Sequence, residues 1–300
     1  MLVPRPSMAG ALAVDQVGEL SFRASAPRAA RQRRLFGGQV MAQALLAAGR
    51  TVAPALNPNL LHARFFRMGN AAQDVDYRID AFADHGAFAH RRVTAFQGGT
   101  QILDLTASFH RAEEGPEHQF PPSAPGDPEQ LPTFRDLAVA DEDTHQWWAR
   151  LSPWLPVEVR APRVPGRWIP APGDEFVPRQ HVWFKSNGEL GDEPLVHAAA
   201  AAYTSDLFLL TAAMVRHGLR HDDAGVLAVT LNHTVWFHRP FRADEWWRYE
   251  QEGSWSGAAR LLCRGQMFNR TGRLVATTMQ EGLLRVNEES LRIAEQRLAG

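Results

Sequence analysis

The stretches Phe36-Gly-Gly-Gln-Val-Met-Ala-Gln-Ala-Leu-Leu46 and Asp206-Leu-Phe-Leu-Leu-Thr-Ala-Ala-Met-Val215 stand at corresponding places in two copies of one layout. Both are apolar almost all round at helical spacing, so each predicts a buried helix, over residues 35–50 and 206–215. His62-Ala-Arg-Phe-Phe-Arg67 follows the first stretch, and His233-Thr-Val-Trp-Phe-His-Arg239 follows the second. The copies lie about 170 residues apart, which indicates an internal duplication of one supersecondary unit.

Runs typical of strands complete each copy. In the second copy, residues 229–238 alternate, so one face should carry Val229, Leu231, Val235 and Phe237. The other face should then carry Thr230, Asn232, Thr234, Trp236 and His238. Long antiparallel strands around one buried helix require a curved sheet, and two such units that pair edge to edge would hide their edge strands.

The segment between the copies differs in composition. Of the 20 prolines in the chain, 13 lie between Pro116 and Pro178. Proline removes a backbone donor, so this segment should hold little sheet and run over the surface. A short helix is expected near residues 141–151, with Trp147 and Trp148 packed inward. We therefore predict three parts: a first unit at 1–111, a Pro-rich linker at 112–177 and a second unit at 178–300.

Composition limits the functions that fit. A net charge of −1 offers no field to attract DNA or RNA, so no nucleic-acid partner is expected. The single cysteine, Cys263, cannot form an internal disulfide, which favours a reducing compartment, and we predict a cytoplasmic protein. No stretch reads as a membrane span or signal peptide. His217 and His221 lack an acidic ligand motif, so no metal site and no cofactor are predicted. A homo-oligomer stays open.

Five motifs, in the same order along the chain, resemble those of the type II acyl-CoA thioesterases, the TesB-like family. They are Leu35-Phe-Gly-Gly-Gln-Val-Met-Ala-Gln-Ala-Leu45, Arg91-Arg-Val-Thr-Ala-Phe-Gln-Gly98 with Thr106-Ala-Ser-Phe109, Tyr203-Thr-Ser-Asp-Leu-Phe-Leu-Leu210, Asn232-His-Thr-Val-Trp-Phe-His-Arg-Pro-Phe241 and Leu274-Val-Ala-Thr-Thr-Met-Gln-Glu-Gly-Leu-Leu-Arg285. The resemblance covers residues 21–287. It implies an α+β double hotdog fold, in which two long buried helices are each wrapped by a curved antiparallel sheet.

The resemblance also implies an activity and a catalytic trio. The activity is hydrolysis of fatty acyl-CoA to a free fatty acid and CoA by an activated water. The trio falls on Asp206, Thr230 and Gln280, with Asp206 at the start of the second helix. The chemistry fits these residue types: a carboxylate can take the proton of a water, while a hydroxyl and an amide hold that water in place. By default, however, Asp206 would be a helix cap, and Thr230 and Gln280 ordinary strand residues.

The start of the first helix supplies candidate substrate contacts. Gly37 and Gly38 let a substrate approach the backbone, and free N–H groups at a helix start suit an oxyanion, so both are candidates for the oxyanion hole. Gln39, in the same turn, is a further candidate for substrate binding; it stands near the place of Asp206 in the other copy but cannot act as a base. His62 and His233 read as a matched pair with a structural role.

Two departures from the family pattern bear on activity, and two other functions compete. Met68 stands where the pattern has Pro, and Asn232 where it has Asp. An enoyl-CoA hydratase of the hotdog type would need an Asp with a His five residues later, but Thr211 and Ala44 occupy those places. A non-catalytic protein that binds or senses acyl-CoA is the other alternative, and an intact trio argues against it.

Overall fold

The structure is a computed structural model that describes residues 6–26, 34–123, 126–139, 141–168 and 177–299. In this part of the chain the strands form one 12-stranded sheet in the order β1-β2-β4-β5-β6-β3-β9-β12-β11-β10-β8-β7, and every neighbouring pair is antiparallel. The strands of the first half are β1 Asp15–Gly18, β2 Ser21–Ala24, β3 Leu56–Phe65, β4 Val75–His85, β5 Phe88–Gln97 and β6 Thr100–Arg111. Those of the second half are β7 Val157–Arg160, β8 Arg179–Ser186, β9 Val226–Phe237, β10 Trp247–Gly257, β11 Arg260–Asn269 and β12 Leu274–Val286.

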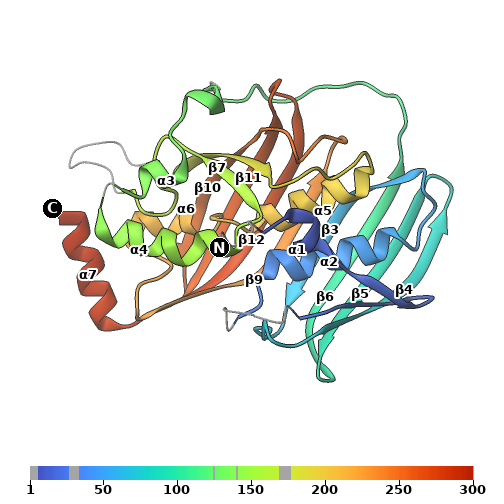
Figure 1. Cartoon of the computed structure of the whole chain (residues 1–300), viewed down its shortest axis with the longest axis horizontal. Coiled ribbons are helices and arrows are strands. Elements are labelled where there is room, and N and C mark those ends of the chain that lie inside the picture. Colours follow the sequence, from blue (N-terminus) through green and yellow to red (C-terminus); the bar gives the residue numbers. More distant parts are fainter. Residues whose placement is uncertain (1–5, 27–33, 124–125, 140, 169–176, 300) are drawn as a thin grey trace, which may run out of the picture.

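The helices lie mainly on one face of this sheet, and α2 and α5 lie side by side near its middle (Figure 1). The α-helices are α1 Met8–Leu12, α2 Gly37–Gly49, α3 Phe134–Leu137, α4 Glu142–Leu151, α5 Pro194–Ser205, α6 Thr211–Met214 and α7 Glu288–Ala299. The described residues also include single turns of 3-10 helix, namely η1 Pro128–Gln130, η2 Ser152–Trp154 and η3 Val215–His217. The buried side chains of both halves form one continuous hydrophobic core. No described helix is long and apolar enough to cross a membrane.

The two halves repeat the same irregularities of the sheet. Extra residues shift the register at Asn59 in β3 and at Phe82 in β4. The matching shifts in β9 and β10 fall at Leu231 and Ser254, each 172 positions later in the chain. A β-bulge is a specific structural feature, so two pairs of bulges with the same offset show which strand residues of the two halves are equivalent.

The halves join where β3 pairs with β9. His62 is opposite Thr234 in this pairing, and the two residues are equivalent under the 172-residue offset. His62 Nδ1 lies 2.8 Å from Thr234 Oγ1. The local twofold relation therefore passes between these two side chains. His62 and His233 are thus not the matched pair that the sequence suggested: His62 is only partly buried, whereas His233 is fully buried on the opposite face.

The first predicted central helix is confirmed, because α2 spans Gly37–Gly49. The second was misplaced: α5 spans Pro194–Ser205, and only the short α6 lies within the predicted 206–215. The break follows from Phe208, whose φ of 63° is left-handed and cannot continue an α-helix. Two side chains of the sheet stabilise the backbone at this break. Gln251 Nε2 donates to the Leu207 carbonyl across 2.7 Å, and Gln180 Nε2 donates to the Phe208 carbonyl across 2.9 Å.

The proline-rich segment runs along the margin of the sheet after β6 and then forms α3 and α4 (Figure 1). The helix predicted near 141–151 is confirmed as α4, which begins after the capping residue Asp141. Trp147 and Trp148 pack against the ring of Phe134 at centroid distances of 5.4 and 4.6 Å. The described part of the segment contributes four residues to the sheet, as the edge strand β7.

Candidate active site

Three polar side chains from separate elements meet at one end of α5. The Thr230 hydroxyl donates a hydrogen bond to Oδ1 of Asp206 across 3.1 Å, and Gln280 Nε2 donates to the same oxygen across 2.5 Å. Gln280 Nε2 also lies 2.7 Å from Thr230 Oγ1. Each of the three groups therefore contacts the other two, and the cluster combines a base, a hydroxyl and an amide.

Asp206 is the C-cap of α5, not the first residue of a helix as predicted. A helix C-terminus disfavours a nearby anion, so α5 does not stabilise this carboxylate. The helix that does so is α2, because the N–H of Gly38 in its first turn donates to Oδ2 of Asp206 across 2.8 Å. The close approach of Gly38 to Tyr203, and of Gly49 to Leu195, shows that α2 and α5 pack antiparallel. This packing brings the start of α2 to the end of α5.

Thr230 reaches the cluster because β9 carries a bulge. Regular alternation would put Thr230 on the same face as Trp236, as the sequence predicted. The register shift at Leu231 reverses the alternation, since side chains alternate with a period of two. Thr230 therefore shares the inner face with His233, the residue that pairs with Gln280 on β12.

Gly37 and Gly38, the predicted oxyanion donors, begin α2 beside Asp206. A Cβ on Gly37 would lie 3.0 Å from Asp206 Oδ2, and one on Gly38 would lie 2.4 Å from the carbonyl oxygen of Tyr203. Only glycine leaves enough room at Gly38. Its N–H already donates to Asp206, so it is not free for a substrate oxygen. Among the described residues, none accepts a hydrogen bond from the N–H of Gly37.

Gln39 is not brought into the cluster by any described hydrogen bond. Its backbone N–H donates to the Phe36 carbonyl across 3.2 Å, and its side chain has no partner among the described residues. The predicted correspondence of Gln39 with Asp206 is also wrong, because the two residues lie at opposite ends of their helices. The C-cap of α2, at the place where α5 has Asp206, is Arg50.

Gln280 is fully buried, and its Oε1 has no hydrogen-bond partner among the described residues. The Asp206 carboxylate can only accept hydrogen bonds, so the Gln280 amide must be oriented with its donor Nε2 toward Asp206. Its acceptor Oε1 then points away from Asp206. A buried acceptor without a partner costs about 1–3 kcal/mol. The acceptor is therefore a place for a donor from outside the chain, such as a water.

A second polar pair, which the sequence analysis did not identify, lies behind Asp206. His233 Nε2 is 2.9 Å from Ser205 Oγ, and both residues are 0% exposed. The Ser205 hydroxyl donates its single hydrogen to the Ala202 carbonyl across 2.8 Å, so His233 is the donor to Ser205. Tyr249 also donates to the Ser205 carbonyl across 3.0 Å. These contacts fix the turn that carries Asp206. In the sequence, the contact between Ser205 and His233 was indicated only by the position of both residues within the quoted motifs.

We predict that His233 makes the protein less stable at low pH. Burial lowers the pKa of His233 from 6.5 to about 4. Between these values the unfolded chain binds more protons than the folded chain, so stability is highest above pH 6.5 and falls as the pH drops toward 4. The total loss should be about 3 kcal/mol. Urea unfolding at several pH values measures it, and His233→Gln should flatten the slope in this window. His85→Gln, at the exposed end of β4, is the matched control for the loss of a histidine.

The described residues contain no group of three or more His, Cys, Asp or Glu side chains that could hold a metal ion. Cys263 pairs with Gln280 on the adjacent strand, but burial raises the pKa of its thiol to about 12. A protonated, buried thiol is not a nucleophile.

The chain resembles known proteins both in sequence and in structure. Residues 158–283 match the family model described as acyl-CoA thioesterase, and residues 25–110 match the model of the acyl-CoA thioesterase N-terminal domain. The chain is 33% identical over 270 residues to acyl-coenzyme A thioesterase 8 of Homo sapiens, and the alignment covers 86% of this chain and 82% of that relative. The crystal structure of the acyl-CoA thioesterase II TesB2 from Mycobacterium marinum has a TM-score of 0.76 and 34% identity, and covers 94% of this chain and 100% of that chain.

A conserved protein with a hot dog fold from Alicyclobacillus acidocaldarius has a TM-score of 0.70 at 20% identity, and covers 93% of this chain and 98% of that one. This likeness shows the fold alone. A hotdog-type antiparallel sheet with two central helices, together with these likenesses, defines the class as the hotdog-fold thioesterases. The two family models and the identity over most of the chain then show the family: the chain belongs to the acyl-CoA thioesterases.

Proposed function

We propose that this chain hydrolyses the thioester of fatty acyl-CoA by direct attack of a water molecule that Asp206, Thr230 and Gln280 hold. Thioester hydrolysis of acyl-CoA follows from membership of the family, and the residues that perform it are the proposal. One observation carries it: a carboxylate, a hydroxyl and an amide, each on a different element, lie within 3.1 Å of one another. Such a cluster can fix the position of a water and take its proton.

The reaction proceeds in two steps. The water donates one hydrogen bond to the Asp206 carboxylate and the other to Gln280 Oε1, which has no partner in the described chain. Its oxygen then bonds to the thioester carbon while its proton passes to Asp206, and the carbonyl oxygen becomes an oxyanion. When the intermediate collapses, the carbon–sulfur bond breaks, and the CoA thiolate takes the proton from Asp206. The products are the fatty acid and CoA.

The N–H of Gly37 is the proposed oxyanion donor. It lies at the start of α2, and no described residue accepts its hydrogen bond. A backbone donor at a helix N-terminus stabilises negative charge as it develops. Gly38 has the separate task of donating to Asp206, and Gln39 has no assigned role beyond lying in the same turn.

We also propose that the fold is a double hotdog with units at 1–111 and 178–300, joined by a proline-rich linker at 112–177. The matched bulges of β3 with β9 and of β4 with β10 support the duplication. Acyl-CoA is the substrate. We expect a cytoplasmic location, supported by the single, buried Cys263, and no nucleic-acid partner, because the net charge is −1. A homo-oligomer is compatible with this assignment.

A covalent mechanism through Ser205 is the competing chemistry, because Ser205 and His233 are in contact. Two observations argue against it. Both side chains are 0% exposed, and the Ser205 hydrogen points to the Ala202 carbonyl rather than to His233. His233 therefore donates to Ser205 and cannot take its proton. The hydratase alternative lacks its histidine, and a purely binding role would leave the cluster at Asp206 without a purpose.

Thr230→Ala and Gln280→Ala should each lower kcat by roughly 10-fold or more, but by less than removal of the carboxylate. Each substitution removes one contact of the water and leaves the base in place. The double variant should lose less than the product of the two single losses, because both residues serve one water. Steady-state kinetics on one acyl-CoA measures the three values. Fully multiplicative losses would mean that the residues act on separate steps.

Release of free CoA thiol from acyl-CoA substrates of increasing chain length tests the function itself. The purified protein should release one CoA for each fatty acid formed, without added metal or cofactor. Hydration of an enoyl-CoA with the thioester intact, or binding without release of thiol, would contradict the proposal.

A further inference from the structure

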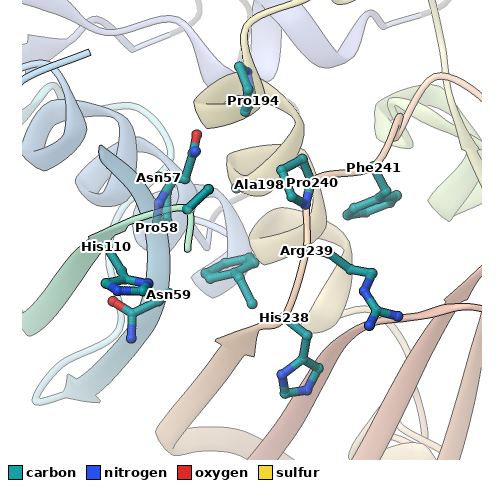
Figure 2. Close-up of a pocket in the computed structure, with 12 residues that line it drawn as sticks. Asn57, Pro58, Asn59, His110, Pro194, Ala198, His238, Arg239, Pro240 and Phe241 are labelled. Carbon is teal, nitrogen blue, oxygen red and sulfur yellow. The ribbon is translucent and has the colours of Figure 1, made fainter. Parts of the chain in front are cut away.

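A cavity lies at the opposite end of the α2–α5 pair from the Asp206 cluster. Its volume is about 610 Å3, including the solvent at its open side. Figure 2 shows Pro194 and Ala198 of α5 on one side, residues 57–59 of β3 on another, and the loop 238–241 after β9 around the rest. Its wall is both apolar, with Phe237 and Pro240, and polar, with Asn57 and Asn59.

The duplication relates this cavity to the proposed active site. Under the 172-residue offset fixed by the bulges, Pro58 in the cavity corresponds to Thr230 in the cluster. Phe237, which lines the cavity beside the start of α5, corresponds to Phe65. The ring of Phe65 lies near Gly37 at the start of α2, 3.3 Å from where its Cβ would be. The cavity is thus the twofold counterpart of the active site.

The catalytic groups are missing at this second end. Pro58 replaces Thr230. Ala107 replaces Gln280, because it pairs with Leu61 on β3 as Gln280 pairs with His233 on β9. The C-terminal end of α2 carries Arg50, which donates to the Val14 carbonyl across 2.6 Å. No carboxylate takes the place of Asp206, so the second end has no base to hydrolyse a thioester.

The start of α5 also lacks the internal acceptor that the start of α2 has. Gly38 N–H donates to Asp206, whereas α5 has no side-chain cap, and no described residue accepts from the N–H of Leu195. First-turn N–H groups without a partner take an acceptor from solvent or from a ligand. Leu195 follows Pro194, which lines the cavity, so a ligand carbonyl oxygen over the start of α5 would take this hydrogen bond.

From these observations we propose that the cavity is a second acyl-CoA site, which binds the thioester without hydrolysing it. The acyl chain packs on the apolar wall formed by Pro58, Ala198 and Phe237, and the carbonyl oxygen faces the start of α5. The proposal rests on the function proposed above, because the ligand is inferred from the twofold relation with the Asp206 site. Its consequence is that each chain binds two molecules of acyl-CoA and hydrolyses at one site.

The probe is a thioether analogue of a fatty acyl-CoA, in which a methylene group separates the sulfur from the carbonyl and prevents hydrolysis. Equilibrium dialysis should give two bound molecules per wild-type chain. Ala198→Leu fills the cavity with a good helix former and should reduce the number to one, with the rate of CoA release unchanged. Asn57→Phe, an aromatic residue in a strand, fills the cavity from β3 and should do the same if Ala198→Leu folds poorly.

The outcomes separate this inference from the proposed function. One bound molecule in the wild type and in both cavity variants would overturn the second site and leave the Asp206 mechanism standing. Two bound molecules that persist in folded cavity variants would overturn it as well. Loss of all binding and of hydrolysis in the cavity variants, with hydrolysis intact in Asp206→Asn, would overturn both, because the active site would then lie in the cavity.

Discussion

Asp206→Asn should lower kcat by about 100-fold or more, the usual scale for a positioned general base. The amide is nearly the same size as the carboxylate, and its oxygen can accept the hydrogen bond that Gly38 donates across 2.8 Å to Oδ2 in the wild type. Its NH2 group then faces Gln280, whose amide turns over so that Oε1, in place of Nε2, lies toward residue 206 and accepts from it. The asparagine side chain cannot accept a proton from water. The thermal midpoint should therefore change little while turnover collapses. Steady-state kinetics together with thermal unfolding of the same preparation measures both effects.

Asp76→Asn is the matched control for this prediction. Asp76 lies on β4, is partly exposed and pairs with Arg23 across 2.7 Å, away from the Asp206 cluster. A surface ion pair of this kind contributes little, so the variant should keep full activity and nearly full stability. Wild-type turnover in Asp206→Asn would remove the base from the mechanism. An equal loss in both aspartate variants would point to a general effect of charge.

Gly38→Ala should damage stability and activity together. The added Cβ would lie 2.4 Å from the carbonyl oxygen of Tyr203 and 2.6 Å from the ring of Phe36. A backbone carbonyl within α5 cannot move aside, so α2 must shift away from α5. Overpacking of this kind costs about 1–3 kcal/mol. The shift also lengthens the hydrogen bond from Gly38 to Asp206, and kcat should fall by roughly 10-fold or more, as expected when a positioned group is displaced.

Gly115→Ala is the control for the glycine substitution, because nothing lies within 4 Å of its added Cβ. It should unfold at the wild-type urea concentration and keep wild-type kcat. Urea unfolding and CoA release, measured on both variants, decide the matter. A Gly38→Ala variant with wild-type stability would show that α2 and α5 are not packed as closely as described. Normal stability with low activity would leave only the contact to Asp206 as the cause.

The first central helix could be predicted from the sequence, and the second could not. The apolar periodicity of residues 37–49 belongs to one uninterrupted helix. Residues 194–215 have a similar composition, but the helix breaks at Asp206 because Gln180 and Gln251, on β8 and β10, hold the carbonyls of Phe208 and Leu207. These partners are distant in sequence, so no local pattern reveals the break.

The residue types of the site came from the resemblance, whereas their arrangement depended on features invisible in a single strand or helix. Alternation along β9 put Thr230 on the wrong face, because a bulge at Leu231 leaves no composition signal. The stabilising helix start for Asp206 was placed on its own helix, because only the packing of α2 against α5 reveals the contact from Gly38. The same bulges set the repeat at 172 residues and turned the expected equivalence of His62 and His233 into one of His62 and Thr234.

The most direct test of water activation by Asp206, Thr230 and Gln280 is a single turnover in water labelled with heavy oxygen. The enzyme is in excess, the reaction is quenched by acid at successive times, and both the fatty acid and the protein are analysed by mass spectrometry. Direct attack predicts one heavy oxygen in the fatty acid and an unmodified protein at every time. An acyl group on the peptide that contains Ser205, or heavy oxygen in the carboxyl group of Asp206, would contradict the account.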